Sequence, residues 1–251
     1  MDWSRRGFVE MLALGAGGLL GCGLPSIPEP GGGSARLSAR PGSPTGSVTA
    51  GLNRLGLGAT REGYLYVPAG YVAGHPTPFL LALHGAGIPA QGPLNLWSAY
   101  AESHGFLLLS VDSADFTWDA MRGPYGTDVA FIDAALQRAF GRVSVDPARL
   151  ALSGFSDGAT YALGLGLANG DLFPRVVACS PGFVMSAPPQ GRPRVFVSHG
   201  TADQILPIDR CSRVIVPRLR MLNYDVTYRE FEGRHEMPPE ILAEALRWMT
   251  A

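Results

Sequence analysis

The sequence predicts an α/β fold in which a mostly parallel sheet is flanked by helices. Beyond about residue 51, short apolar runs rich in branched and aromatic residues alternate with segments of helical periodicity, a pattern typical of βαβ units. In addition, 46% of the residues are apolar and only 16% are charged, so many side chains are expected to be buried. The folded part, about 200 residues, is the right size for one domain with one core.

Residues 1–22 are expected to be an export signal. Arg5 and Arg6 precede an apolar run that is too short to span a bilayer. The paired arginines resemble a twin-arginine signal, and the stretch Leu-Leu-Gly-Cys that ends at Cys22 resembles a lipoprotein cleavage box. This resemblance implies that Cys22 is acylated. It also implies that the protein is exported to the periplasm or cell surface and is held on a membrane only by this lipid.

Residues 23–50 form the next segment, which is rich in Gly, Pro, Ser and Thr. Such a segment buries too little apolar surface to offset its ordering entropy, so we expect a flexible tether. The folded domain is then expected to span residues 51–251.

Within this domain the apolar runs and helical segments alternate along the chain. The expected strands are 63–67, 78–83, 106–111, 150–153, 176–180, 195–198 and 226–231. The expected helices are 94–103, 127–139, 158–167, 209–222 and 239–249. Ligands of such sheets bind outside the carboxyl ends of the strands, and the short connections there leave no room for a large lid.

The candidate nucleophile is Ser156, in the stretch Gly154-Phe155-Ser156-Asp157-Gly158. This is a GxSxG pattern, whose glycines allow a sharp turn that exposes the serine hydroxyl. The pattern alone is weak evidence in a glycine-rich chain. Here, however, a strand candidate directly precedes it and a helix candidate directly follows it, which is the setting that a nucleophile of this kind requires.

A serine nucleophile needs a base to take its proton and an acid to orient that base. Only His199 and His235 follow Ser156 in the chain, and His235 is preferred because Asp203 precedes it at the end of a strand. Asp209 is expected to be a helix N-cap instead. The expected triad is therefore Ser156, Asp203 and His235.

The expected oxyanion site consists of two backbone N–H groups. His84 and Gly85 directly follow an apolar strand, and an HG motif at this place turns a following N–H toward the site. We expect the donors to be Ala86, with Gly87 as the alternative, and Asp157. The His84 side chain is expected to be structural.

Charge and cysteine content narrow the remaining possibilities. The net charge of −1 provides no field to attract nucleic acid, so a small neutral molecule is the expected partner. The spacing of the three cysteines matches no zinc site, and we expect no metal site. Whether Cys179 and Cys211 form a disulfide is left open.

The substrate pocket is expected to be an open apolar cleft. Its walls are predicted from residues 113–126, with Phe116, Trp118, Met121 and Tyr125, joined by Ile88, Trp97, Phe183, Met185 and Leu206. Binding energy ceases to accrue once an acyl chain leaves such a cleft, so short acyl groups should be preferred.

With these residues placed, the domain resembles esterases of the α/β-hydrolase superfamily, of the phospholipase/carboxylesterase or polyhydroxyalkanoate-depolymerase-like type. The resemblance rests on the HG, GxSxG and His-Gly-Thr-Ala-Asp motifs and on the Gly-Arg-His stretch that ends at His235, all in family order. It implies ester hydrolysis without a cofactor, with Ser156, Asp203 and His235 as the triad. Arg234 departs from the family pattern, in which a smaller residue is expected.

Three other functions are also compatible with the sequence. The same triad can serve an amidase, a peptidase or an acyltransferase. A metal-dependent hydrolase would use His84, His199, His235 and Asp203, but no short-spaced ligand pair is present. The third function is a non-catalytic lipoprotein that binds a ligand in a pocket derived from a hydrolase.

Overall fold

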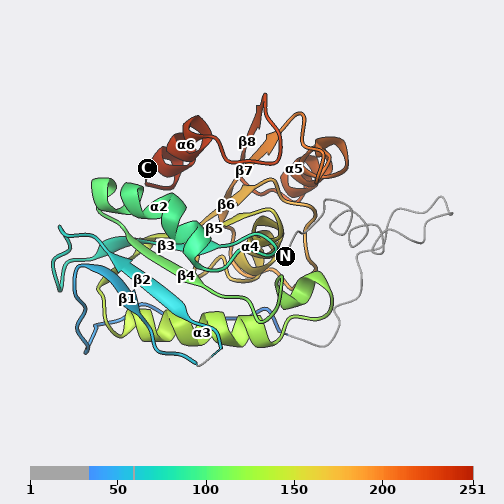
Figure 1. The fold of residues 1–251 in the computed structure, drawn as a ribbon. Coiled ribbons are helices and arrows are strands. Elements are labelled where there is room, and N and C mark those ends of the chain that lie inside the picture. The colour runs from blue at the N-terminus through green and yellow to red at the C-terminus, as the bar shows by residue number, and fades with distance from the viewer. Residues whose placement is uncertain (1–33, 59, 251) are drawn as a thin grey trace.

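The computed structural model describes residues 34–58 and 60–250, which form one eight-stranded sheet flanked by helices (Figure 1). The strands are β1 (Gly51–Arg54), β2 (Gly63–Val67), β3 (Thr77–Leu83), β4 (Leu107–Val111), β5 (Val145–Phe155), β6 (Arg175–Cys179), β7 (Arg194–Gly200) and β8 (Val226–Phe231). Their order in the sheet is β1-β2-β4-β3-β5-β6-β7-β8. Six neighbouring strands are parallel, in the order β4, β3, β5, β6, β7 and β8. Pairing is antiparallel only between β1 and β2 and between β2 and β4 among the described strands.

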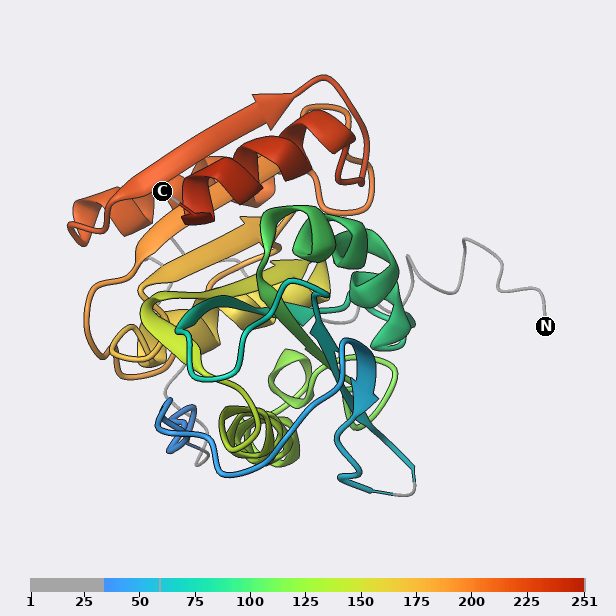
Figure 2. The same ribbon diagram turned by 90° about the vertical axis from the view of Figure 1, so that its left-hand side faces the viewer.

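Helices cover both faces of the sheet. They are α2 (Gln91–His104), α3 (Thr127–Phe140), α4 (Asp157–Ala168), α5 (Ser212–Met221) and α6 (Pro239–Thr250). The helices α2 and α6 share one apolar cluster on one face, while α3, α4 and α5 pack on the other (Figures 1 and 2). The connections at the carboxyl edge of the parallel strands hold only the short 3-10 turns η1 (Asp119–Met121) and η2 (Ile208–Arg210) within the described chain. The predicted α/β fold, a mostly parallel sheet flanked by helices, is confirmed.

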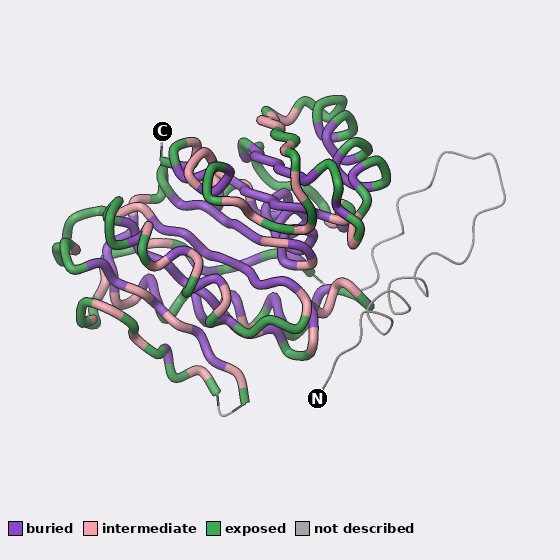
Figure 3. The backbone as a smooth tube through the Cα atoms, turned by 45° about the horizontal axis from the view of Figure 1, so that its top comes forward, coloured by how far each residue is buried: buried purple, intermediate pink, exposed green. Residues whose placement is uncertain are grey.

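The central strands are buried along nearly their whole length, apart from the first residues of β6 and β7, because both of their faces are covered (Figure 3). This explains why their sequences are continuous apolar runs rather than alternating ones. On α3, the buried residues recur on one stripe, including Val129, Ile132 and Leu136, as expected for a helix packed on a sheet. The last turn of α2 stops at Gly105, whose left-handed backbone (φ 67°) is a common helix terminus.

Two predictions about elements were wrong. Strand β1 was not predicted, because its apolar residue Leu52 is 56% exposed and the strand exists only through pairing with β2. Asp209 is not a helix N-cap: it lies in η2, and its carboxylate binds the Arg213 side chain at 2.7 Å, while α5 begins at Ser212. The separate turn η2 shifts the start of this helix.

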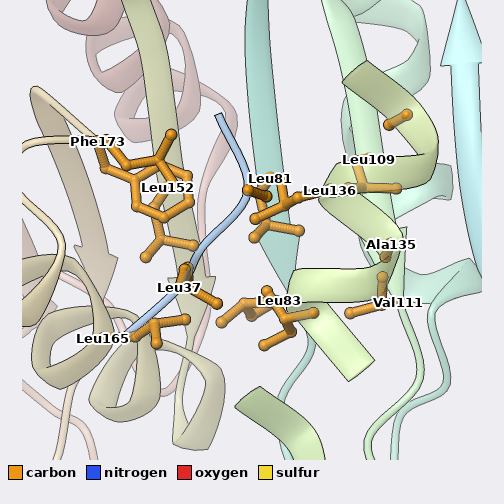
Figure 4. Packing of buried hydrophobic residues seen from close by; sticks show 14 of the residues in the cluster. Leu37, Leu81, Leu83, Leu109, Val111, Ala135, Leu136, Leu152, Leu165 and Phe173 are labelled. Atoms are coloured by element: carbon orange, nitrogen blue, oxygen red, sulfur yellow. The ribbon is translucent and has the colours of Figure 1, made fainter. Parts of the chain in front are cut away.

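The prediction of a tether throughout residues 23–50 was wrong for its second part. Ala35, Leu37 and Ala39 are buried in the main core, at no more than 4% exposed. Figure 4 shows Leu37 among leucines of the sheet and of α4, and Figure 2 shows the segment beside α3. The apolar residues alternate with Ser and Arg, the period of an extended segment with one buried face, and the overall composition concealed this pattern.

Polar contacts also hold this segment in place. The Arg36 and Arg40 side chains bind the Asp171 carboxylate, at 2.9 and 2.6 Å. The Asp133 carboxylate of α3 accepts hydrogen bonds from the backbone N–H groups of Ser38 and Ala39, both at 2.8 Å. The folded unit therefore includes residues from about 35 onward.

The export signal, the arginine pair and Cys22 lie outside the described residues. Within the described part of the chain, none of the helices combines the length and the apolar character needed to cross a membrane.

Candidate active site

Ser156 lies at the turn between β5 and α4. Its backbone is in a strained region for a residue with a side chain, with φ 58° and ψ −121°. The two glycines of the motif are required by close backbone contacts: a Cβ on Gly154 would lie 2.1 Å from the Gly158 carbonyl oxygen, and a Cβ on Gly158 would lie 2.4 Å from the His84 carbonyl oxygen. The strand, turn and helix predicted around Ser156 are therefore present.

The three predicted triad side chains form one hydrogen-bonded line. The Nε2 atom of His235 is 2.8 Å from the Ser156 hydroxyl oxygen, and its Nδ1 atom is 2.6 Å from Oδ2 of Asp203. Ser156 and Asp203 are buried, whereas the His235 side chain is 15% exposed. The Arg234 side chain is exposed, so the residue that departs from the family pattern points into solvent.

Asp203 is held by four donors, of which the sequence had identified one. Its Oδ1 atom accepts hydrogen bonds from the backbone N–H groups of Ile205 and Leu206, both at 2.9 Å. Its Oδ2 atom is approached by His235 and, at 3.2 Å, by Nε2 of His199. Burial alone would raise the pKa of Asp203, but the hydrogen bonds from His199, His235 and Leu206 outweigh it and hold this pKa well below its usual range. The carboxylate therefore stays ionised beside His235.

His199 is a site residue whose role was not predicted. Its side chain is fully buried, and its Nε2 atom lies 2.7 Å from the Leu206 carbonyl oxygen as well as near Asp203. Since both of these neighbours are acceptors, Nε2 carries a proton. Its Nδ1 atom is 2.7 Å from the buried Ser212 hydroxyl. The available sequence signal was the four-position spacing between His199, near the end of β7, and Asp203 in the loop that follows.

The two expected oxyanion donors lie in the loop after β3 and at the first residue of α4. Among the described residues, neither the Ala86 nor the Asp157 backbone N–H donates to a protein acceptor. The alternative donor, Gly87, is engaged, because its N–H donates to the Phe116 carbonyl oxygen at 2.7 Å. The Asp157 carboxylate accepts the Thr117 hydroxyl at 2.6 Å, so its side chain is turned away from the nucleophile.

His84 supports the loop and takes no part in the triad. Its Nδ1 atom donates to the Gly85 carbonyl oxygen at 2.9 Å, and its Nε2 atom accepts the Ser113 N–H at 3.1 Å. The imidazole packs on the Trp118 ring, with centroids 4.6 Å apart. Burial lowers the pKa of His84, so the ring is neutral.

The predicted pocket wall was partly wrong. Trp118, Tyr125 and Met185 are at most 7% exposed and belong to the main core. The Trp118 indole N–H donates to the His84 carbonyl oxygen at 2.9 Å, so this ring supports the oxyanion loop from inside. Phe183 is 46% exposed, and Ile88 lines a cavity together with Trp97.

A buried carboxylate orders the loop that contains these aromatic residues. Asp128, 1% exposed, accepts hydrogen bonds from the backbone N–H groups of Ala114 and Asp119, at 2.7 and 2.8 Å, and pairs with Arg61 at 2.7 Å. Burial raises the pKa of Asp128 despite these donors. Residues 113–126 are therefore fixed in position next to the site.

The other candidate reactive groups are the cysteine thiols and possible metal ligands. Cys179 and Cys211 are both buried free thiols, and burial raises the pKa of each to about 11, so neither is a thiolate at neutral pH. In residues 34–250, apart from residue 59, no group of three or more His, Cys, Asp or Glu side chains is arranged to hold a metal ion.

Comparison with known proteins agrees with this geometry. A family model described as phospholipase/carboxylesterase matches residues 128–251, the part that contains Ser156, Asp203 and His235. No curated protein sequence matches the chain.

Solved structures share the fold at low sequence identity. Esterase PE8 is 21% identical, with a TM-score of 0.60 over 74% of this chain and 98% of that one. The Bacillus cereus carboxylesterase is 20% identical, with a TM-score of 0.59 over 78% of this chain and 96% of that one. The fluorophosphonate-binding serine hydrolase FphF of Staphylococcus aureus is 14% identical, with a TM-score of 0.61 over 76% of this chain and 92% of that one. The likeness to these structures identifies the α/β-hydrolase fold, and together with the family match it supports a serine esterase.

Proposed function

We propose that this serine esterase hydrolyses small carboxylic esters through an acyl-enzyme on Ser156. The observation that carries the proposal is the continuous line of hydrogen bonds from the Ser156 hydroxyl through His235 to Asp203. A hydroxyl positioned in this way transfers its proton to the imidazole as it attacks a carbonyl carbon.

Each side chain has a defined part in the reaction. His235 takes the Ser156 proton, and the Ala86 and Asp157 N–H groups stabilise the negative charge that develops on the carbonyl oxygen. His235 then donates this proton to the leaving alcohol, and the bond between the acyl carbon and the alcohol oxygen breaks. A water molecule, activated by the same imidazole, releases the acid. Asp203 stays charged throughout and stabilises the imidazolium.

Short acyl groups are the proposed acyl substrates. The site is bordered by loops and 3-10 turns within the described chain, and large apolar side chains at its rim are partly solvent-exposed, with Ile88 at 41% and Phe183 at 46%. A long acyl chain would leave such a surface after a few carbons and would gain nothing from its remaining methylenes.

The geometry favours this function over the alternatives. Both ring nitrogens of His84 and of His199 are bound to protein groups, so they are not free to be metal ligands. A strained nucleophile aligned with a base and an acid has no use in a protein that only binds a ligand. Amide hydrolysis and acyl transfer use the same triad, and a matched ester and amide separate amide hydrolysis from ester hydrolysis.

The proposed location is a membrane surface outside the cytoplasm, with the domain anchored by lipid on Cys22. The support is the signal-like sequence of residues 1–22. Cys22→Ser should release the protein from membranes or stall its processing. Intact-mass analysis of a mature protein that starts elsewhere, or carries no lipid, would refute the anchor.

The test of the catalytic proposal is hydrolysis of p-nitrophenyl esters from acetate to palmitate, beside p-nitroacetanilide as the amide. We expect a maximum of kcat/KM at or below about six acyl carbons and little anilide cleavage. Ser156→Ala and His235→Ala should each lower kcat by roughly 10⁴-fold or more, whereas the matched surface variants Ser103→Ala and His104→Ala should not. Near wild-type turnover in either triad variant would refute the proposal.

A further inference from the structure

An apolar cavity of about 180 Å³ adjoins the triad on the α2 side of the sheet. It lies between the ends of β3 and β5, the first turns of α2, and Met237. Its apolar wall includes Leu83, Ile88, Leu96, Trp97, Phe155 and Met237. The inner residues are buried, whereas Ile88 is 41% exposed and Leu96 and Met237 are half-buried, so this side forms the mouth. A larger cavity, about 660 Å³, is lined by residues near the amino ends of β3 and β5, away from the triad.

Residues of the smaller cavity's wall lie close to both reacting side chains. A Cβ built on Gly85, which lines the cavity, would lie 3.3 Å from the Ser156 Cβ. The Phe155 ring packs on the His235 ring with centroids 4.7 Å apart, and Met237 follows His235 by two residues. Residues that line the cavity therefore lie next to both the nucleophile and the base.

The chemistry determines which part of an ester lies beside His235. In the step that forms the acyl-enzyme, the acyl carbon is bonded to the Ser156 oxygen, and Nε2 of His235 passes its proton to the alcohol oxygen as the carbon–oxygen bond breaks. The alcohol oxygen is therefore within hydrogen-bond distance of His235 at that moment. The chain on this oxygen extends next to His235, where Phe155 and Met237 form the cavity wall.

We propose that this cavity receives the alcohol group of the substrate, an unbranched primary alcohol of up to about six carbons. The proposal rests on the proposed esterase function and adds the substrate class on the alcohol side. The size follows from the volume, since an apolar protein cavity of about 150 Å³ accommodates benzene, which has six carbons. The lining residues Leu96 and Trp97 then determine alcohol length.

Two ester series separate the alcohol side from the acyl side. One series joins acetate to primary alcohols from ethanol to octanol, and the other joins ethanol to acids from acetate to octanoate, with acid release followed by titration. In the alcohol series, kcat/KM should rise by up to about fourfold per methylene until about six carbons and then level off.

Two variants change the cavity in opposite directions. Leu96→Ala enlarges it, and should raise kcat/KM for octyl acetate relative to ethyl acetate by at least about fivefold. Gly92→Ala narrows it, because the new Cβ would lie 2.3 Å from Cγ2 of Ile88 and displace that side chain inward or across the mouth. This variant should lower kcat/KM for hexyl acetate relative to ethyl acetate by about fivefold. Leu57→Ala, a half-buried leucine on the other face, is the matched control and should leave both series unchanged.

The outcomes are distinct. A response of the acyl series to Leu96→Ala would assign the cavity to the acyl group and overturn the proposal, as would no response in either series. If no ester is turned over at all, the proposed function fails, and direct binding then decides the cavity's role. Titration of 1-hexanol should change the Trp97 fluorescence, and Trp97→Phe should abolish the change. An unaltered spectrum in the folded wild-type protein would overturn the proposal independently of activity.

Discussion

The second histidine on Asp203 provides a sharp test of how the acid is held. His199→Leu removes a buried donor that lies 3.2 Å from Oδ2 of Asp203, while the other three donors remain. A hydrogen bond to a charged group contributes about 1.5–3 kcal/mol. The lower end applies here, because the Nε2 proton is shared with the Leu206 carbonyl oxygen, which is closer at 2.7 Å. At 1.36 kcal/mol per unit, the pKa of Asp203 should rise by about one unit.

The sign of the pH effect follows from the lowered pKa of Asp203. Its contribution to stability is fully present above the pKa of an unfolded aspartate, about 3.9, and is lost as the pH falls through the folded value. In His199→Leu this contribution is smaller by about 1.5 kcal/mol and is lost at a higher pH. The Leu206 carbonyl and the Ser212 hydroxyl also lose their partner, which costs about 1–3 kcal/mol more at every pH.

The assay pairs urea denaturation between pH 1 and 8, a range that reaches the lowered pKa of Asp203, with kcat and KM for p-nitrophenyl acetate. Because His199 acts through Asp203, kcat should fall by about tenfold while KM changes little. This loss of kcat is far smaller than the roughly 10⁴-fold loss on removing a triad aspartate in a comparable hydrolase. His199→Gln keeps an N–H in the same position and should restore most of kcat. The reasoning is refuted if His199→Leu retains wild-type kcat and the wild-type pH dependence of stability.

Two further predictions concern the fold around the site. Gly154→Ala places a Cβ 2.1 Å from a backbone oxygen, and should lower the free energy of unfolding by at least about 3 kcal/mol. The control Gly123→Ala, whose new Cβ would have its nearest neighbour at 4.0 Å, should change this free energy by no more than about 0.5 kcal/mol. Equal melting temperatures for the two variants would contradict this prediction. The hydrogen bonds from Arg36 and then Arg40 lower the pKa of Asp171 from 3.8 to about 2. Asp171→Asn should therefore cost at most about 1 kcal/mol near neutral pH, since these ion pairs are partly exposed. Urea titrations should show this difference vanish as the pH falls from 3.8 to about 2, and a difference that persists at pH 2 would show that Asp171 does not act through its charge.

The triad could be predicted from the sequence because its signals are local. Ser156 is marked by a motif with a strand before it and a helix after it, and His235 and Asp203 by their order at strand ends. The fold could be predicted for a similar reason, since the buried strands are continuous apolar runs. Strand β1 was missed because its apolar residue faces solvent.

The rest depends on contacts between distant residues. Trp118 reads as a pocket aromatic, but its partner is the carbonyl of His84, thirty-four positions away, and only the folded chain places it inside. Leu37 lies in a segment with the composition of a linker, and its burial depends on contact with apolar residues of α4 and the sheet. His199 was considered only as a rival base. The sequence does not show that the chain after β7 brings Asp203 and Ser212 to its two ring nitrogens.

The central claim, a covalent acyl-enzyme on Ser156, is tested most directly by mass. Wild-type protein is mixed with p-nitrophenyl acetate, quenched in acid within milliseconds to seconds, and analysed intact and after proteolysis. We predict the added mass of one acetyl group on the peptide that contains Ser156, appearing with the first release of p-nitrophenol and absent in Ser156→Ala. Acetyl on another residue, or continued turnover by Ser156→Ala with no adduct in the wild-type protein, would contradict it.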